Sequence, residues 1–337
     1  MTPSFYSDEM ITAIESELHS VIESANSTES DGLERMLAYH MGWEGEGAGL
    51  EARGKRLRPL ILLLTTASCG GDWKCAVPAA AAVELLHNFS LIHDDIQDQS
   101  PLRRGRPTIW KQWGIAQAIN VGDTMFTLAQ VGILRLKDFV PAEVVIQASQ
   151  ILLSASIELT RGQFLDISYE TRDNLDVESY WPMVTGKTAA LLGACTELGA
   201  LIAYMGDPIR AEYRRFGRLL GIAFQVQDDL LGIWGDSILT GKSSESDLVA
   251  GKKSLPVLYA LGKNGKFSQR WRKGAITTDA IPELRELLEE EGALIYINNM
   301  ERELTRKALQ ALESTRPQGE AGTALNDLAH WLLERQS

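Results

Sequence analysis

The chain lacks the cysteine pattern of a disulfide-rich or zinc-binding protein. Its three cysteines, Cys69, Cys75 and Cys195, are odd in number and have no CxxC spacing, so we expect buried, reduced thiols in a reducing compartment. It also lacks an uncharged apolar run of 18 residues, and its first ten residues do not have the basic start and apolar centre of a signal peptide. These absences predict a cytoplasmic protein with no transmembrane segment.

Basic residues are outnumbered, because 33 Lys and Arg against 45 Asp and Glu give a formal net charge of −12. No long basic face is available to neutralise a phosphate backbone, so we expect no nucleic acid as a partner. Alternating strand patterns and Ser/Pro/Gly linkers are nearly absent, whereas helical periodicity runs from about residue 8 to residue 335. The sequence predicts one all-α domain, 1–337, as a bundle of about a dozen helices around a central apolar cavity.

The most informative stretch, residues 84–98, reads as an apolar helix that ends in aspartates. At helical spacing Asp94 and Asp98 lie on one face, with His87 further along the same face. Two stacked carboxylates repel each other unless a cation lies against them, and hard oxygen ligands suit Mg²⁺ shared with phosphates. This stretch therefore predicts a magnesium and phosphate site.

A second apolar helix ends in the same way, at Asp228 and Asp229. If the two helices face each other across the bundle, two acidic clusters meet at one end of an apolar cavity. Such a cavity suits a diphosphate with a hydrocarbon tail.

An anionic ligand on an acidic protein requires local cations. The run Gly54-Lys55-Arg56-Leu57-Arg58-Pro59 places three cations at a predicted helix start, where backbone N–H groups also attract anions. Taken alone, this hexapeptide is also typical of a solvated charged turn. A second cationic group, Arg103, Arg104 and Arg106, follows the first aspartates.

The other segments are predicted as scaffold and connections. We expect helices over about 7–24, 110–135, 142–170 and 207–229, with a loose connection over 24–52 and a charged helical hairpin over about 278–335. Gly186, within 185–190, interrupts a helical pattern and is expected to kink or break it.

Taken together, these motifs resemble the trans-isoprenyl diphosphate synthases, the polyprenyl synthetase family. The resemblance rests on Asp94-Asp95-Ile96-Gln97-Asp98 with Arg103-Arg104-Gly105, on the second motif around Asp228-Asp229, and on the run Gly54-Lys55-Arg56-Leu57-Arg58-Pro59, and it covers about 50–262. It implies a prenyltransferase that condenses isopentenyl diphosphate with an allylic diphosphate (dimethylallyl, geranyl or farnesyl) by Mg²⁺-assisted ionisation.

The resemblance also implies roles for individual residues. Three Mg²⁺ ions would be held by Asp94, Asp98 and Asp228, and the neighbouring Asp95 and Asp229 would join the catalytic set. The allylic diphosphate would contact Arg103, Lys187, Lys242 and Lys252. Isopentenyl diphosphate would be bound without metal by Lys55, Arg58, His87 and Arg104. Thr188 and Gln225 would offer oxygen atoms to the developing carbocation. A homodimer is usual in the family.

Two positions bear on activity and product length. The family's second motif usually has a third aspartate, where this chain has Gly232, so we expect activity to survive with weaker metal binding. Phe89 precedes Asp94 by five residues, about 7 to 8 Å along a helix. In relatives an aromatic here accompanies geranylgeranyl diphosphate, so we expect this product. Farnesyl and longer products stay open.

Two other functions compete with this interpretation. A class I terpene cyclase has the same fold and aspartate motif but does not need the metal-free diphosphate site of Lys55, Arg58 and Arg104. A non-catalytic regulatory subunit would be expected to lose metal ligands, of which Gly232 is the one sign.

Overall fold

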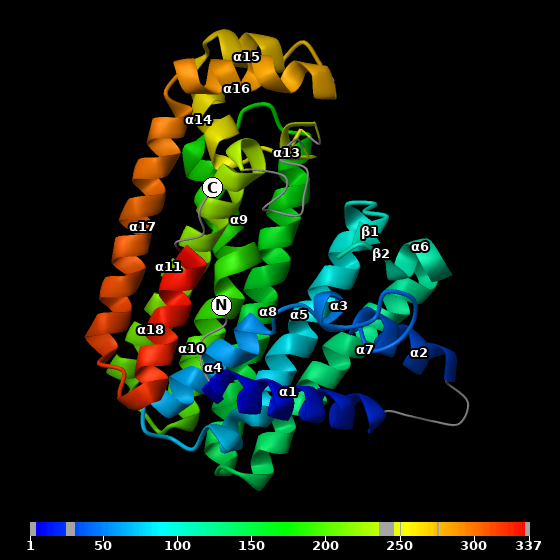
Figure 1. Ribbon diagram of the computed structural model, residues 1–337, viewed down its shortest axis with the longest axis vertical. Helices are drawn as coiled ribbons and strands as arrows, with labels where there is room; N and C mark the ends of the chain where they lie inside the picture. Colours follow the sequence, from blue (N-terminus) through cyan, green and yellow to red (C-terminus); the bar gives the residue numbers. More distant parts are fainter. Residues whose placement is uncertain (1–4, 25–30, 236–245, 250, 275, 334–337) are drawn as a thin grey trace. The chain divides into compact units, whose positions relative to one another are not determined.

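The computed structural model describes residues 5–24, 31–235, 246–249, 251–274 and 276–333, and these are almost entirely helical (Figure 1). The predicted all-α class is confirmed. The described strands are the two-residue β1 (Leu102–Arg103) and β2 (Arg106–Pro107), an antiparallel hairpin that pairs Leu102 with Pro107 and Arg103 with Arg106.

The chain forms two compact units, and each consists of three chain segments. The first unit contains residues 1–153, 194–210 and 317–325, and the second contains 154–193, 211–316 and 326–337. The prediction that all of these residues form one domain stays a prediction.

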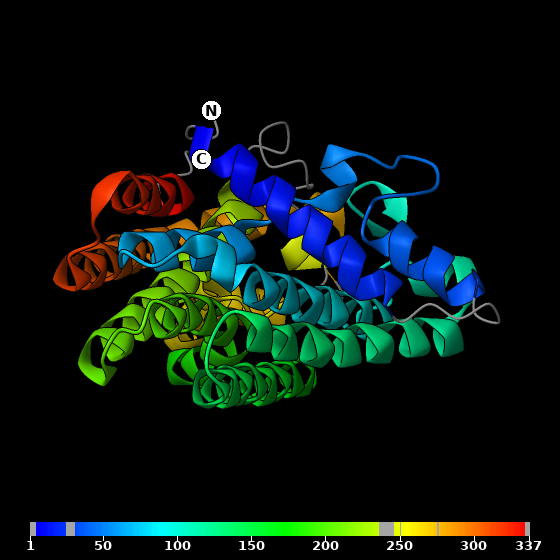
Figure 2. The ribbon, with the colours of Figure 1, turned by 90° about the horizontal axis from the view of Figure 1, so that it is seen from below.

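The first unit is built around α5 (Val77–Gln97), which begins with Pro78 in its first turn and continues through four fully buried alanines, 79–82. These small side chains let neighbouring helices approach closely. Helix α5 packs against α1 (Phe5–Glu23) and α7 (Ile115–Leu134), and Figure 2 shows these three helices as successive layers. The remaining elements are α2 (Asp31–His40), α3 (Leu50–Arg53), α4 (Leu57–Ser68), η1 (Trp73–Ala76), α6 (Ile109–Trp113), η2 (Arg135–Asp138), the start of α8 (Ala142–Glu170) and most of α10 (Ala190–Ile202).

The second unit contains most of α8 and of α11 (Asp207–Trp234). A short π-helix, η3 (Thr185–Ala189), joins α9 (Val177–Val184) to α10. Its other elements are α13 (Ser246–Val249), α14 (Leu255–Lys263), α15 (Lys266–Trp271), η4 (Thr278–Ala280), α16 (Ile281–Glu290), α17 (Ala293–Thr315) and the end of α18 (Gly319–Leu333). Figure 1 shows α15 and α16 crossing the ends of α14 and α17, and apolar residues from these helices form a common core.

Three predictions need correction. The 24–52 stretch is not just a loose connection, because it contains α2 and α3 and buries Leu37 and Met41. The C-terminal stretch contains three α-helices, α16 to α18, instead of a hairpin. Of the cysteines, all of them free thiols, Cys195 is buried, whereas Cys69 and Cys75 are half-exposed because they lie in the turn after α4 and in η1.

By length and composition alone, two described helical stretches could cross a membrane, Trp73–Gln97 and Ala142–Glu170. In the first stretch, 67% of the most apolar window is buried within the protein. In the second, 39% is buried. The prediction of no transmembrane segment stays a prediction.

Candidate active site

The first aspartate motif lies at the C-terminal end of α5, where Asp94 occupies the last turn and Asp98 is the C-cap residue. Helix carbonyls at this end carry partial negative charge, so two carboxylates here are unfavourable without a cation nearby. The Asp94 side chain is 21% exposed, and Asp98 is exposed. The helix end is therefore a strongly electronegative position that a divalent cation would stabilise.

Asp95, the middle residue of the motif, points into a different environment. Its carboxylate accepts hydrogen bonds from Arg103 Nε, at 2.9 Å to each oxygen, and pairs with Arg103 Nη2 at 2.8 Å. Burial raises the pKa of Asp95, although Arg103 opposes this shift. The β1–β2 hairpin thus places the Arg103 side chain beside the end of α5. Arg103 Nη2 lies 3.6 Å from Asp94 Oδ2.

A separate cationic cluster lies in the same unit. Arg58, in the first turn of α4, donates from Nη1 to His87 Nε2 at 3.3 Å. Burial, together with Arg58 and Arg104, lowers the pKa of His87 well below its usual value. His87 is therefore a neutral acceptor that orients Arg58, and the positive charge of the cluster comes from arginine.

Arg104 reaches this cluster by docking on the chain before α4. Its Nη1 donates to the carbonyl oxygen of Ala52 at 2.8 Å. Gly54 has φ +76°, and a Cβ atom there would lie 2.6 Å from Arg104 Cζ. The Arg104 guanidinium thus occupies the space that a side chain at Gly54 would need. Lys55, the next residue, is exposed.

Arg56, which the sequence groups with Lys55 and Arg58, has a structural role. It is 3% exposed and pairs with Glu15 at 2.6 Å and with Glu84 at 2.8 Å. Glu84 also accepts a hydrogen bond from Asn88 at 3.1 Å. Sequence reasoning missed this network, since its members come from three separate segments: α1, the chain before α4, and α5.

His40 is a second residue that the sequence did not reveal. Its Nε2 is buried and has no hydrogen-bond partner. Burial, followed by the charges of Arg103, Arg104 and Arg56, lowers its pKa to about 3. A neutral imidazole thus lies among the arginines.

Aromatic side chains lie further back along α5. The Phe89 ring packs against Phe126 of α7, with centroids 5.2 Å apart, and against His93, with centroids 4.8 Å apart. A Cβ atom at Gly122 would collide with His93 Nε2, at 2.2 Å. Phe89 is therefore backed by a second aromatic residue instead of open space.

In the second unit, the π-helix carries Lys187 and Thr188, so the predicted irregularity around Gly186 is confirmed. Two glycines make it possible. A Cβ atom at Gly162 of α8 would lie 2.0 Å from the Lys187 backbone nitrogen, and one at Gly186 would lie 2.6 Å from the Glu158 carbonyl oxygen. The backbones touch here, and Lys187 Nζ pairs with Asp166 Oδ2 of α8 at 2.5 Å.

The second aspartate motif joins a hydrogen-bonded chain. Thr188 donates to Gln225 Oε1 at 2.9 Å, and Gln225 Nε2 donates to Asp229 Oδ1 at 3.0 Å. The other oxygen of Asp229 accepts the backbone N–H of Leu255 at 3.0 Å. Burial, followed by the charge of Asp229, raises the pKa of the Tyr180 hydroxyl well above its usual value. Thr188 and Gln225 are thus held in fixed orientations.

Asp228 is less buried than Asp229, and Gly232 follows it one turn later within α11. Lys252 is exposed, whereas Lys242 lies outside the described residues. Asp94 and Asp98 belong to the first unit and Asp228 to the second, so the predicted meeting of the two motifs stays a prediction.

The described residues hold no ready-made group of three or more His, Cys, Asp or Glu side chains for a metal ion. Asp94 and Asp98 supply two hard oxygen ligands from one helix, and Mg²⁺ commonly completes its shell with water and phosphate oxygens. The donor set therefore fits Mg²⁺ bound together with a phosphate ligand.

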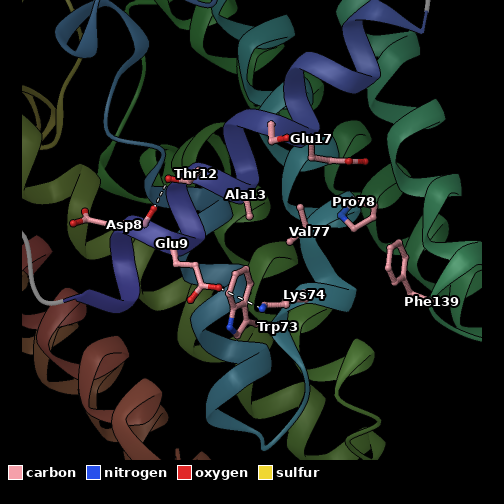
Figure 3. Close-up of a pocket in the computed structure, with 11 residues that line it drawn as sticks. Asp8, Glu9, Thr12, Ala13, Glu17, Trp73, Lys74, Val77, Pro78 and Phe139 are labelled. Carbon is pink, nitrogen blue, oxygen red and sulfur yellow. Dashed lines mark hydrogen bonds and ion pairs between the residues drawn. The ribbon is translucent and has the colours of Figure 1, made fainter.

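A pocket of about 580 Å³ opens elsewhere in the first unit, between α1 and the start of α5 (Figure 3). Trp73, Val77 and Pro78 form part of its lining, together with Glu17 and, on the far side, Phe139. None of the predicted site residues lines this pocket.

Comparison with known proteins identifies the family. Residues 48–288 match the polyprenyl synthetase family. The chain is 42% identical over 251 residues to a geranylgeranyl diphosphate synthase of Mycobacterium tuberculosis, covering 74% of this chain and 70% of the relative. It is 36% identical over 312 residues to a (2E,6E)-farnesyl diphosphate synthase of Mycobacterium bovis, covering 90% and 86%. A geranylgeranyl pyrophosphate synthetase from Pyrococcus horikoshii superposes with a TM-score of 0.88 at 31% identity, over 98% of each chain. The resemblance noted in the sequence is confirmed, and the chain belongs to the polyprenyl synthetase family.

Proposed function

We propose that this protein is a trans-prenyltransferase that condenses isopentenyl diphosphate with an allylic diphosphate to give a linear product, geranylgeranyl diphosphate. The observation that carries the proposal is the presence of two different anion-binding devices in one unit. One is the aspartate-tipped end of α5, which needs a cation, and the other is the cluster of Arg58, Arg104 and His87, which does not. A terpene cyclase binds one diphosphate and has no use for the second device.

The allylic diphosphate is assigned to the carboxylates Asp94, Asp98 and Asp228 through three Mg²⁺ ions. Bound Mg²⁺ would neutralise the charge that develops on the departing diphosphate. Arg103, held by Asp95, and Lys187, held by Asp166, add positive charge from the protein. Lys242 and Lys252 are assigned to the same diphosphate by the resemblance.

Thr188 and Gln225 are assigned to the developing allylic carbocation. The Gln225 amide nitrogen donates to Asp229, so its oxygen side faces Thr188. Oxygen dipoles fixed before the reaction stabilise a cation without reorganising. The carbocation is then attacked by the double bond of isopentenyl diphosphate, and a proton is lost to the released diphosphate.

Isopentenyl diphosphate is assigned to Lys55, Arg58, Arg104 and, through Arg58, to His87. Guanidinium groups bind phosphate oxygens in a bidentate manner and stay charged at any working pH. Arg58 is oriented by His87, and Arg104 is anchored on Ala52. Pre-oriented donors of this kind hold the nucleophile beside the site of ionisation.

The product length is assigned from Phe89 and its partner Phe126. The two rings pack together and form a larger barrier to the growing hydrocarbon chain than one ring would. The similarity to geranylgeranyl diphosphate synthases supports the assignment. Because the chain is also similar to a farnesyl diphosphate synthase, the alternative product is farnesyl diphosphate.

The protein is further proposed to act in the cytoplasm as a homodimer. On α8, Ile146, Leu153, Ile157 and Phe164 are 58%, 42%, 54% and 65% exposed. They fall within about 40° of one another around the helix axis. A long apolar stripe of this kind suits burial against a second copy.

The test is to supply the purified protein with Mg²⁺, isopentenyl diphosphate and each allylic primer in turn, and to size the products by chromatography. Geranylgeranyl diphosphate is the expected product. A cyclic hydrocarbon, or no product from any primer, would overturn the proposed function.

A further inference from the structure

Lys253 binds the end of a helix. Its Nζ donates to the carbonyl oxygens of Tyr169 at 2.7 Å and Glu170 at 3.3 Å, and also to that of Arg172. Helix α8 ends at Glu170, so two of these carbonyls belong to its last turn. The carbonyl oxygens of a last turn have no N–H donor within the helix. An ammonium group has three donors, and it complements the negative end of the helix dipole.

The same short segment is held at a second point, two residues later. The backbone N–H of Leu255, the first residue of α14, donates to Asp229 Oδ2 at 3.0 Å. Ser254, between the two attachments, is 8% exposed and has an extended backbone. Residues 253–255 are therefore tied to α8 by a side chain and to α11 by a backbone group.

Asp229 takes part through both of its oxygen atoms. Oδ1 accepts from Gln225, and Oδ2 accepts from Leu255. Asp228, its neighbour, is less buried. The two adjacent aspartates thus differ in environment.

We propose that Lys253 and Asp229 are positioning residues that form a two-point clamp on residues 253–255 and thereby fix the backbone beside Lys252. The inference rests on the proposed function in one respect, the assignment of Lys252 to the allylic diphosphate. The backbone next to Lys252 is ordered by the clamp before the substrate arrives, so less ordering is needed on binding. By the same inference, Asp229 is a hydrogen-bond acceptor for the clamp.

The kinetic test compares Lys253→Met with Lys253→Arg and with Lys273→Met, an exposed lysine after α15. Lys253→Met keeps the apolar stem but removes all three donors. We expect it to raise KM for the allylic diphosphate by about tenfold, with KM for isopentenyl diphosphate unchanged. Lys253→Arg is expected to recover part of the loss, and Lys273→Met to behave as wild type. An unchanged allylic KM in Lys253→Met would overturn the clamp.

A second pair of variants separates the aspartates. Asp228→Asn is expected to raise the Mg²⁺ concentration needed for half-maximal activity by about tenfold or more. Asp229→Asn is expected to leave that concentration unchanged and to raise the allylic KM. An equal shift in Mg²⁺ requirement for both variants would contradict the assignment of Asp229.

Amide hydrogen exchange tests the clamp without substrate. In Lys253→Met, and in Lys253→Gln if the first variant fails to fold, exchange is expected to quicken in peptides covering 168–173 and 253–258, with α1 peptides as the internal control. Unchanged exchange in both regions would rule out the clamp. If wild type makes no prenyl product, the proposed function fails, but this measurement still decides on the clamp.

Discussion

Asp95 and Arg103 form a two-oxygen contact in which Arg103 Nε lies 2.9 Å from each carboxylate oxygen. The contact fixes Arg103 at the end of α5, so Asp95 acts through this arginine. We expect Asp95→Asn to lower kcat/KM for the allylic diphosphate by about 10- to 100-fold, which corresponds to losing one charged hydrogen bond. Asp123→Asn, at an exposed position on α7, is the matched control in steady-state kinetics. Equal kinetics for the two variants would contradict this role.

Gly54 is expected to tolerate no side chain, because Arg104 occupies the space of its Cβ atom. Gly54→Ala should displace the guanidinium and raise KM for isopentenyl diphosphate by about tenfold. Gly70→Ala is a matched control, since Gly70 has a similar φ of +80° but nothing within 4 Å of its Cβ position. Both variants carry backbone strain, so a rise in KM confined to Gly54→Ala isolates the contact with Arg104. The same KM for isopentenyl diphosphate in both variants would contradict the role of Gly54 in placing Arg104.

Phe89→Ala is expected to lengthen the product by at least one five-carbon unit, because it removes the first of the two rings that block the growing hydrocarbon chain. Phe126 stands behind it at 5.2 Å, so Phe89→Ala/Phe126→Ala should give still longer products. Chromatography of the products from a farnesyl primer measures both. An unchanged product in the double variant would remove these aromatics as the end of the cavity.

His40 makes the stability of the fold depend on pH. Its pKa is about 3 in the folded protein and about 6.5 when unfolded. The unfolded chain therefore takes up a proton first as the pH falls, so the free energy of unfolding drops by about 1.4 kcal/mol for each pH unit below about 6.5. This loss continues down to the folded pKa.

Urea unfolding at about pH 7.5, 6 and 5 measures this dependence in wild type and in His40→Gln. The variant lacks the His40 contribution, so its free energy of unfolding should fall less steeply with decreasing pH. His87, which is also held neutral, is present in both proteins and cancels from the comparison. Parallel pH profiles would contradict the assignment to His40.

The exposed stripe on α8 predicts the effect of charge on assembly. Ile157→Glu should convert a dimer to monomer in sedimentation or light scattering, because a buried unpaired carboxylate is costly. Ile295→Glu is the control, since Ile295 on α17 is 67% exposed but lies outside the stripe. A wild-type protein that is monomeric, or an Ile157→Glu variant that stays dimeric, would rule out this interface.

Helix patterns predicted the parts of the fold that depend on neighbours in sequence. The end of α5 beside Asp94 and Asp98 and the span of α8 both follow from local periodicity. Roles that depend on distant partners could not be predicted. Arg56, one of the three cations grouped at a predicted helix start, pairs with Glu84 and Glu15 in a buried network.

The same limit applies to the second motif. The contact of Asp229 with the Leu255 backbone, 26 residues later, could not be read from the sequence of the motif. Helix α2 was missed because its short amphipathic pattern lies between polar and glycine-containing residues, and its burial comes from other helices. Long-range packing decided each of these cases.

The backbone contact between Gly162 and Gly186 limits how the enzyme can be changed. Neither glycine has a side chain that mutation could shorten, so Lys187 and Thr188 cannot be shifted in that way. Any atom added at either position would push α8 and the π-helix apart. Engineering for altered substrates should therefore hold both glycines constant and draw its variation from the aromatic residues of α5 and α7.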